Sequence, residues 1–269
     1  RDDVAVEKNG YGSYDIQIKQ TISWTGNLTN VSGKITRNKL VLYDTNTLTP
    51  PQSCDFGWWQ TDGKKVTSLK ELYDSLTEDE RSSSQYISMD KESADLMLSS
   101  LRDNDTYLAY VTLDRIMDYK DFIRFINDKS LGNVWCGVFI PKSDYYEDEM
   151  SLGLPYLGFV CNPWFGREDA GLDEYPNLFT GLDNKDELAD EDFAKQHFLS
   201  MLRYMRDNKR SASVMSSIED LTNALDPAID YVEKNGLKIH GFAITATKDK
   251  LMKINDMKEV YAISTKEFK

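Results

Sequence analysis

The pattern of apolar and polar positions is clearest in the second half of the chain. A nearly continuous apolar run at residues 106–113 predicts an interior strand, because a strand buried on both faces need not alternate. Residues 118–128 carry Phe and Ile at helical spacing and predict a helix with one buried stripe. A second apolar run at 133–140 predicts another interior strand. Strand, helix and strand within about 35 residues have the size of a βαβ unit.

The end of the chain repeats this order. Residues 238–246 and 259–264 predict two strands, and residues 248–254 between them predict a short helix. The interval between the two half-units predicts one more strand and two helices, at residues 156–161, 190–207 and 216–234. We therefore predict an α+β fold, in which a mixed sheet is built from two βαβ-like half-units in a split arrangement, with helices packed on it.

The first part of the chain has a different composition and a different pattern of predicted elements. Residues 1–66 are rich in Thr, Asn, Gly and Tyr, and the patterns at residues 14–19 and 39–43 predict short strands. Two short helices follow. Thr67 or Ser68 caps the first, where Ser68 and Glu71 form a capping-box pattern, and the second is predicted at residues 91–101. We therefore divide the chain into a β-rich segment with short helices, residues 1–97, and an α+β domain, residues 98–269.

The charged residues are unevenly distributed along the chain. The 269 residues include 45 acidic and 32 basic side chains, which gives a net charge of −13. Almost all of this excess lies in residues 143–192, the acidic interval, where 14 acids accompany 2 basic residues. Phosphates repel such a protein, so nucleic acid is not expected as a partner. A solvated surface loop is the expected structure of the acidic interval, and a loose Ca²⁺ site is the alternative.

Residue types with catalytic or metal-binding chemistry are few and scattered. His197 and His240 lack a second histidine at metal-ligand spacing, and the sequence has no nucleophile elbow or phosphate-binding glycine loop. His197 lies on an apolar helical stripe, which favours a hydrogen-bonded core imidazole over a general base. Cys136 and Cys161 lie in apolar runs and are expected to be inert core thiols, while a bridge between them stays open. We therefore predict no enzyme, no cofactor and no metal site.

Several segments of the second half together resemble a known family. They are the strand at residues 107–114, the helix after it, the strand centred on Trp135, and the closing segments 239–251 and 260–263. Residues 33–43 also look like the stretch that precedes the domain in such proteins. Over about residues 98–264, the chain resembles the sigma factor regulator C-terminal family, which is found in anti-sigma factors of Gram-positive bacteria.

The resemblance implies a location and a partner. In proteins of this kind a short cytoplasmic segment binds the sigma factor, one membrane helix follows, and the outer domain is extracytoplasmic. We therefore expect a sensory, non-catalytic domain on the extracellular face of the cell membrane, within a single-pass protein that controls sigma-dependent transcription. Residues 1–97 would be its juxtamembrane segment. Since the chain opens with Arg1 and not Met, we expect an excised piece without the sigma-binding segment and the membrane helix.

Seven residues are candidates for a partner or ligand surface, because exposed tryptophans and clustered carboxylates suit a sugar, a cation or a basic partner. They are Trp58, Trp59, Trp164, Asp144, Glu147, Asp148 and Glu149. The expected ligand is an extracellular protein or a cell-wall component. For Trp58 and Trp59 a buried aromatic plug is the favoured interpretation. The alternative function is that of a secreted hydrolase or carbohydrate-binding protein, which would use exposed Trp and paired carboxylates.

Overall fold

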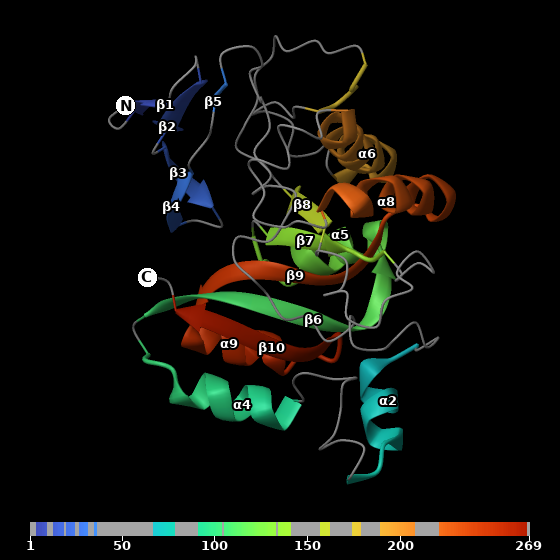
Figure 1. Cartoon of the computed structure of the whole chain (residues 1–269). Helices are drawn as coiled ribbons and strands as arrows, with labels where there is room; N and C mark the ends of the chain where they lie inside the picture. Colours follow the sequence, from blue (N-terminus) through green and yellow to red (C-terminus); the bar gives the residue numbers. More distant parts are fainter. Residues whose placement is uncertain are drawn as a thin grey trace.

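The structure is a computed structural model of the chain (Figure 1). It describes residues 4–9, 13–18, 20–24, 27–31, 35–36, 67–78, 91–103, 105–132, 134–140, 157–161, 174–178, 189–207 and 221–267. Near the N-terminus, one small antiparallel sheet has the order β1 (Val4–Asn9), β2 (Ser13–Ile18) and β5 (Ile35–Thr36). The other is a hairpin of β3 (Gln20–Trp24) and β4 (Asn27–Val31). The strand predicted at residues 39–43 lies outside the described residues.

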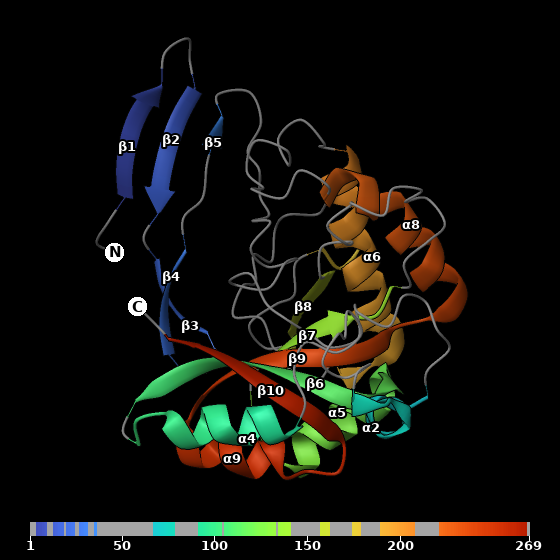
Figure 2. The same ribbon diagram turned by 60° about the horizontal axis from the view of Figure 1, so that its bottom comes forward.

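A five-stranded sheet organises the second half of the chain. In spatial order its strands are β10 (Val260–Glu267), β6 (Thr106–Asp118), β9 (Lys238–Thr247), β7 (Val134–Val138) and β8 (Leu157–Cys161). Each neighbouring pair in this sheet runs antiparallel. Figure 2 shows β10, β6 and β9 side by side, with helices beneath them.

Two helices connect strands that are parallel but not adjacent. α5 (Tyr119–Asp128) links β6 to β7, which flank β9, and α9 (Lys248–Asn255) links β9 to β10, which flank β6. Since β6 and β7 both run antiparallel to β9, they are parallel to each other, as a split βαβ unit requires. The α+β class and the two split half-units are thus confirmed. The sheet differs from the predicted mixed sheet in one respect: the half-units interlock, so each strand has antiparallel neighbours.

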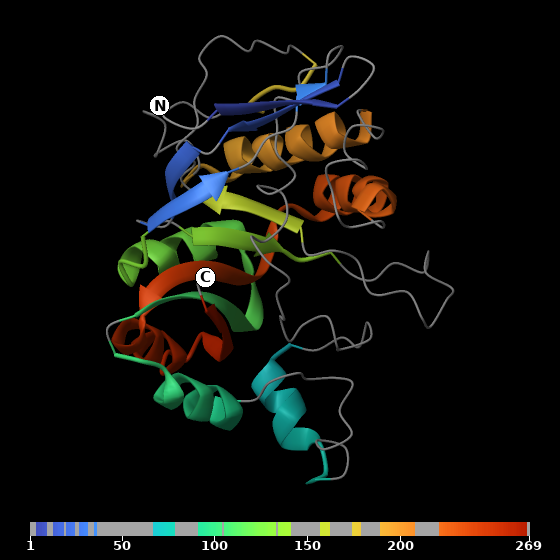
Figure 3. The same ribbon diagram turned by 60° about the vertical axis from the view of Figure 1, so that its left-hand side comes forward.

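The connection between the half-units adds β8 and two long helices. α6 (Glu191–Asp207) and α8 (Leu221–Asn235) pack against each other, and the Arg203 guanidinium lies 2.5 Å from a Glu233 carboxylate oxygen. Two helices that precede the sheet, α2 (Leu69–Ser75) and α4 (Lys91–Ser100), lie at the other end of it. In Figure 3 α2 and α4 lie toward the bottom of the view, and α6 and α8 lie toward the top.

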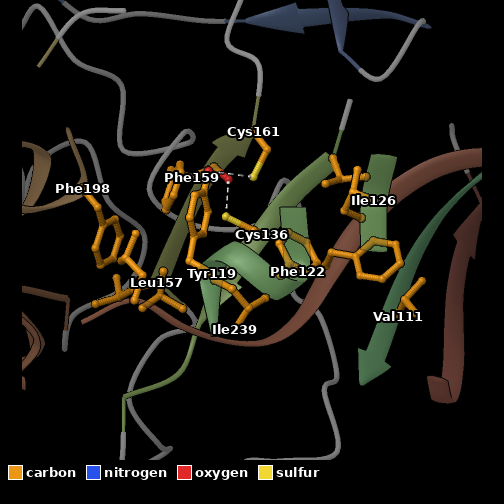
Figure 4. Packing of buried hydrophobic residues seen from close by; sticks show 14 of the residues in the cluster. Val111, Tyr119, Phe122, Ile126, Cys136, Leu157, Phe159, Cys161, Phe198 and Ile239 are labelled. Atoms are coloured by element: carbon orange, nitrogen blue, oxygen red, sulfur yellow. Dashed lines mark hydrogen bonds between the residues drawn. The ribbon is translucent and has the colours of Figure 1, made fainter. Parts of the chain in front are cut away.

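The main core fills the space between the sheet and its helices. Phe159 of β8 contacts Tyr119 of α5 and Phe198 of α6, with ring centroids 5.8 and 5.5 Å away, so both helices lie against one face of the sheet (Figure 4). On the same face Phe122 of α5 packs on Phe242 of β9, at 5.9 Å. All five rings are buried. Each buried aromatic or aliphatic side chain contributes about 1.5–3 kcal/mol. The buried cluster to which these rings belong is larger than the others in the described part of the chain, so it makes the largest contribution to stability.

Strand β6 is five residues longer than the apolar run that predicted it. The run ends at Leu113, whereas the strand continues to Asp118 after an irregularity in its pairing with β9. In the extension Met117 lies opposite Ile239, and the Asp118 carboxylate pairs with the Lys238 ammonium. Because these residues are partly polar, tertiary pairing rather than apolar periodicity extends the strand.

Candidate functional site

The candidate partner surface falls in parts of the chain outside the described residues. This holds for all seven members, Trp58, Trp59, Trp164, Asp144, Glu147, Asp148 and Glu149. The surface therefore stays a prediction. Within the acidic interval the structure describes residues 157–161, 174–178 and 189–192, and these show how part of the interval is attached to the domain.

Residues 174–178 of the acidic interval are held on α6 by polar contacts. His197 Nδ1 lies 2.7 Å from the Asn177 carbonyl oxygen, and the Ser200 hydroxyl donates to the Pro176 carbonyl at 2.5 Å. Near the end of α6, the Tyr175 hydroxyl donates to the Asp207 carboxylate at 2.9 Å. The side chains of His197 and Ser200 are buried, so their hydrogen bonds attach residues 174–178 firmly to α6.

The protonation states at this attachment follow from burial. Burial lowers the pKa of His197 to about 4, which the hydrogen bond to the Asn177 carbonyl opposes only in part. The imidazole is therefore neutral at neutral pH, and its Nδ1 carries the proton because a carbonyl can only accept. Burial and the neighbouring Asp207 carboxylate raise the pKa of Tyr175 to about 12. His197 is thus the hydrogen-bonded core imidazole that its apolar stripe indicated.

The two core thiols lie close together beneath α5. Cys136 of β7 stands opposite Phe159, whereas Cys161 of β8 stands opposite Val134, so the two cysteines are diagonal neighbours. Diagonal Cα atoms are about 7–8 Å apart, beyond the usual range for a disulfide of roughly 4.4–6.8 Å. Both thiols are free, and the Cys136 thiol donates to the Phe159 carbonyl at 3.3 Å (Figure 4). Burial raises the pKa of Cys136, which keeps it protonated.

The other face of the sheet carries three glycines in one row. Gly158, Gly137 and Gly241 stand opposite one another across β8, β7 and β9. The rings of His240 and Trp135 occupy the space where side chains of these glycines would lie. A Cβ on Gly137 would lie 2.7 Å from His240 Nε2, and a Cβ on Gly158 would lie 2.5 Å from Trp135 Cζ2. Burial lowers the pKa of His240 to about 3, so this ring is also neutral at neutral pH. The second histidine thus belongs to the packing of the sheet.

Two general features of the described part of the chain bear on its chemistry. There, no three His, Cys, Asp or Glu side chains gather as ligands for a metal ion. In the same part, no helix combines the length and the apolar character needed to cross a bilayer.

Comparison with known families bears on the part of the chain that contains the five-stranded sheet. The family model described as sigma factor regulator C-terminal matches residues 98–267, more than half of the 269 residues. The chain belongs to the sigma factor regulator C-terminal family. Searches of curated proteins and of solved structures gave no match. Family membership confirms the predicted resemblance and supports a role in sigma-factor regulation.

The matched residues of this sigma factor regulator domain coincide with the split βαβ core. They run from within α4 to the last residue of β10 and so contain the whole five-stranded sheet. α4 begins seven residues before the match, and its buried Leu98 belongs to the same core as the sheet. The division of the chain at residues 97 and 98 stays a prediction.

One helix outside the match is attached to the sigma factor regulator domain by a carboxylate. The Ser68 hydroxyl before α2 donates to the Asp114 carboxylate of β6, with its Oγ 3.0 and 2.8 Å from the two oxygens. The backbone N–H of Lys70 donates to the same group at 2.8 Å. Ser68 also accepts from Glu71 N–H at 3.2 Å, as the capping-box pattern predicts. The role of Asp114 could not be predicted from the sequence, because no local pattern links it to Ser68, 46 positions away.

Proposed function

We propose that this chain is the extracytoplasmic sensory domain of a membrane-anchored anti-sigma factor from a Gram-positive bacterium. The observation that carries the proposal is the family match over the complete split βαβ core. The domain would control sigma-dependent transcription without catalysis. A cytoplasmic segment of the same protein would bind the sigma factor, and a membrane helix would join that segment to this domain.

The acidic interval is the proposed ligand surface. It carries 14 acidic and 2 basic residues, and an attachment made by His197 and Ser200 holds part of it on α6. A surface of this charge attracts cations or a basic partner at short range. An extracellular protein or a cell-wall component would therefore bind through Asp144 and Glu147–Glu149, with Trp58, Trp59 and Trp164 as the aromatic members of the same surface.

The chemistry of the described core supports binding rather than turnover. The two histidines are buried and neutral, and the Cys136 thiol is buried and protonated, so each of these groups serves packing or hydrogen bonding. Within the described residues we find no observation that favours the alternative of a secreted hydrolase or carbohydrate-binding protein.

Two measurements on the complete natural protein test the proposal. Alkaline phosphatase fused after Lys269 should be active if the domain lies outside the membrane, and β-galactosidase at the same position should be inactive. Deletion of residues 98–269 should change the output of a sigma-dependent reporter. An active β-galactosidase fusion would overturn the extracytoplasmic location. An unchanged reporter would overturn the regulatory role.

A further inference from the structure

α2 is a short helix that depends on the surface beneath it. It spans seven residues, Leu69–Ser75, and isolated helices of fewer than about 12 residues are marginal in water. Its outer side, which includes Lys70, Glu71 and Asp74, is exposed. Leu69 is the one buried residue within the helix. The helical state of this segment is therefore tied to its contacts with the domain.

The polar contacts of α2 meet at one carboxylate. Asp114 accepts from the Ser68 hydroxyl and from the Lys70 N–H, two groups at the start of the helix. Its own backbone N–H donates to the Glu259 carbonyl at 2.9 Å, which fixes its place between β6 and the turn before β10. Charge-assisted hydrogen bonds of this kind are about twice as strong as neutral ones. Asp114 thus holds the beginning of α2 from an element that the family domain supplies.

The apolar contacts of α2 form a cluster separate from the main core. Leu69 packs with Ala94 of α4 and with Tyr261 and Ala262 of β10, and all four are buried. Partly buried side chains surround them: Leu72, Tyr73, Leu76 and Ile116. Because this cluster does not share buried residues with the main core, its loss would leave the packing between the sheet and α5 intact.

Asp114 keeps a charged neighbour when α2 is detached from the domain. The Arg115 guanidinium lies 3.8 Å from an Asp114 oxygen and 3.4 Å from a Glu71 oxygen, so it bridges strand and helix in the docked state. When α2 leaves, Arg115 remains beside Asp114 on the same strand and compensates its charge. Asp114 is 14% exposed, so water also reaches it. Release of α2 therefore does not carry the free-energy cost of an unpaired buried charge at Asp114.

We propose that α2 is a strap that folds and docks in one step on β6 and β10, with Asp114 as its attachment point. The strap couples the residues before Thr67 to the sigma factor regulator domain, because a change that pulls on those residues acts first on the Ser68 end of α2. This second part rests on the proposed function, in which the preceding segment leads to the membrane. Release of α2 would uncover Tyr261 and Ala262 while the five-stranded sheet stays folded.

Hydrogen–deuterium exchange of the 269-residue chain, followed by mass spectrometry, tests the strap. Asp114→Asn removes the charge and leaves the shape, so amides in residues 69–76 should exchange roughly tenfold to a hundredfold faster than in the unmodified chain. Peptides from β6, β9 and β10 should keep their protection. Ser68→Ala removes the donor on the other side of the contact and should act in the same direction. The matched control is Asp118→Asn, a carboxylate on the same strand that pairs with Lys238 instead.

Two results would overturn the strap. One is unchanged protection of residues 69–76 in both Asp114→Asn and Ser68→Ala. The other is loss of protection in the whole sheet, which would make Asp114 a support of the core and not a separable attachment. If Asp114→Asn does not fold, the comparison of Ser68→Ala with Asp118→Asn decides the same question.

A reporter experiment in the complete natural protein separates the strap from the proposed function. Asp114→Asn should change sigma-dependent output, and Asp118→Asn should not. If deletion of residues 98–269 changes the output while Asp114→Asn does not, the coupling role of the strap is wrong and the proposed function stands. If the deletion has no effect, the proposed function is wrong, while the exchange result still decides whether α2 docks as a strap.

Discussion

His197 of α6 packs nearly perpendicular to Phe159 of β8, with ring centroids 5.7 Å apart and ring planes at 77°. On its other side its Nδ1 donates to the carbonyl of Asn177 in the acidic interval. One imidazole therefore joins the sheet, a helix and an inserted segment. A positive charge on this ring would lie in apolar surroundings, which is the reason that burial favours its neutral form.

We expect stability to fall as pH drops below about 6.5. The pKa of His197 is about 4 in the folded protein and near 6.5 in the unfolded chain, so the unfolded chain binds the proton more tightly. The contribution of His197 is fully present above pH 6.5 and is lost as pH falls from 6.5 to 4. It amounts to about 3 kcal/mol over that window. Urea denaturation at pH 7, 6, 5 and 4 measures it.

His197→Gln is the matched variant for this pH dependence. Gln does not titrate, so the slope of unfolding free energy against pH between 6.5 and 4 should become shallower by about 1.4 kcal/mol per pH unit. His240, whose pKa burial lowers to about 3, still contributes a slope of the same sign in the variant. Equal slopes for both proteins would contradict the neutral, buried state of His197.

The apolar patterns of the chain predicted most strands of the sheet, but few of the polar contacts that extend them or attach other elements to them. The runs at residues 106–113, 133–140 and 238–246 predict three buried strands, because strands covered on both faces are apolar throughout. The repeated strand–helix–strand pattern also predicted two split half-units, but not the interlocked order in which β9 lies between β6 and β7. The extension of β6 to Asp118 was not predicted, because Asp114, Arg115 and Asp118 interrupt the apolar run and pairing with β9 holds the end of the strand.

The attachments that shape the candidate site are long-range. The Ser200 hydroxyl donates to the Pro176 backbone carbonyl 24 positions away, and the Ser68 hydroxyl donates to the Asp114 carboxylate 46 positions away. Local spacing carries no information about such pairs, whereas it did reveal the cap that Ser68 provides for α2. For the proposed ligand surface, the sequence predicted the residue types and the charge. That these residues form one surface stays a prediction.

The glycine row should be intolerant of a single methyl group. A Cβ on Gly158 would lie 2.0 Å from the Cys136 carbonyl oxygen and 2.5 Å from Trp135, contacts that require the β7–β8 pair to move. We expect Gly158→Ala to destabilise the protein by about 3 kcal/mol or more, or to prevent folding. Gly132→Ala is the control: its Cβ meets no atom within 4 Å, and its φ of +83° alone should cost about 1 kcal/mol. Thermal unfolding of the two variants compares them, and equal losses would be inconsistent with the close approach.

Lys248 should contribute to holding α4 on the domain. Its ammonium donates to the carbonyls of Ser99 and Leu101 at 3.0 Å each, at the end of α4, and pairs with Asp103 at 2.9 Å. Lys248→Met should lower the unfolding free energy by about 1–2 kcal/mol, because carbonyls at a helix end lose a charged donor. Lys258→Met, which removes a surface pair with Glu259, should change it by less than about 0.5 kcal/mol. Urea denaturation that ranks the two variants equally would argue against the attachment.

The diagonal placement of Cys136 and Cys161 leads to a prediction about thiol chemistry. A Cys54→Ser variant leaves these two as the only cysteines, and both are buried, so a thiol reagent should react with fewer than about one tenth of them in the folded protein. In urea, two equivalents per chain should react. Incubation of the folded variant with oxidised glutathione should leave its mass unchanged, because both thiols are buried and diagonal neighbours in an antiparallel pair have Cα atoms about 7–8 Å apart, a spacing that disfavours a disulfide. A loss of two mass units together with both reactive thiols would show that the strands shift far enough to form the bridge.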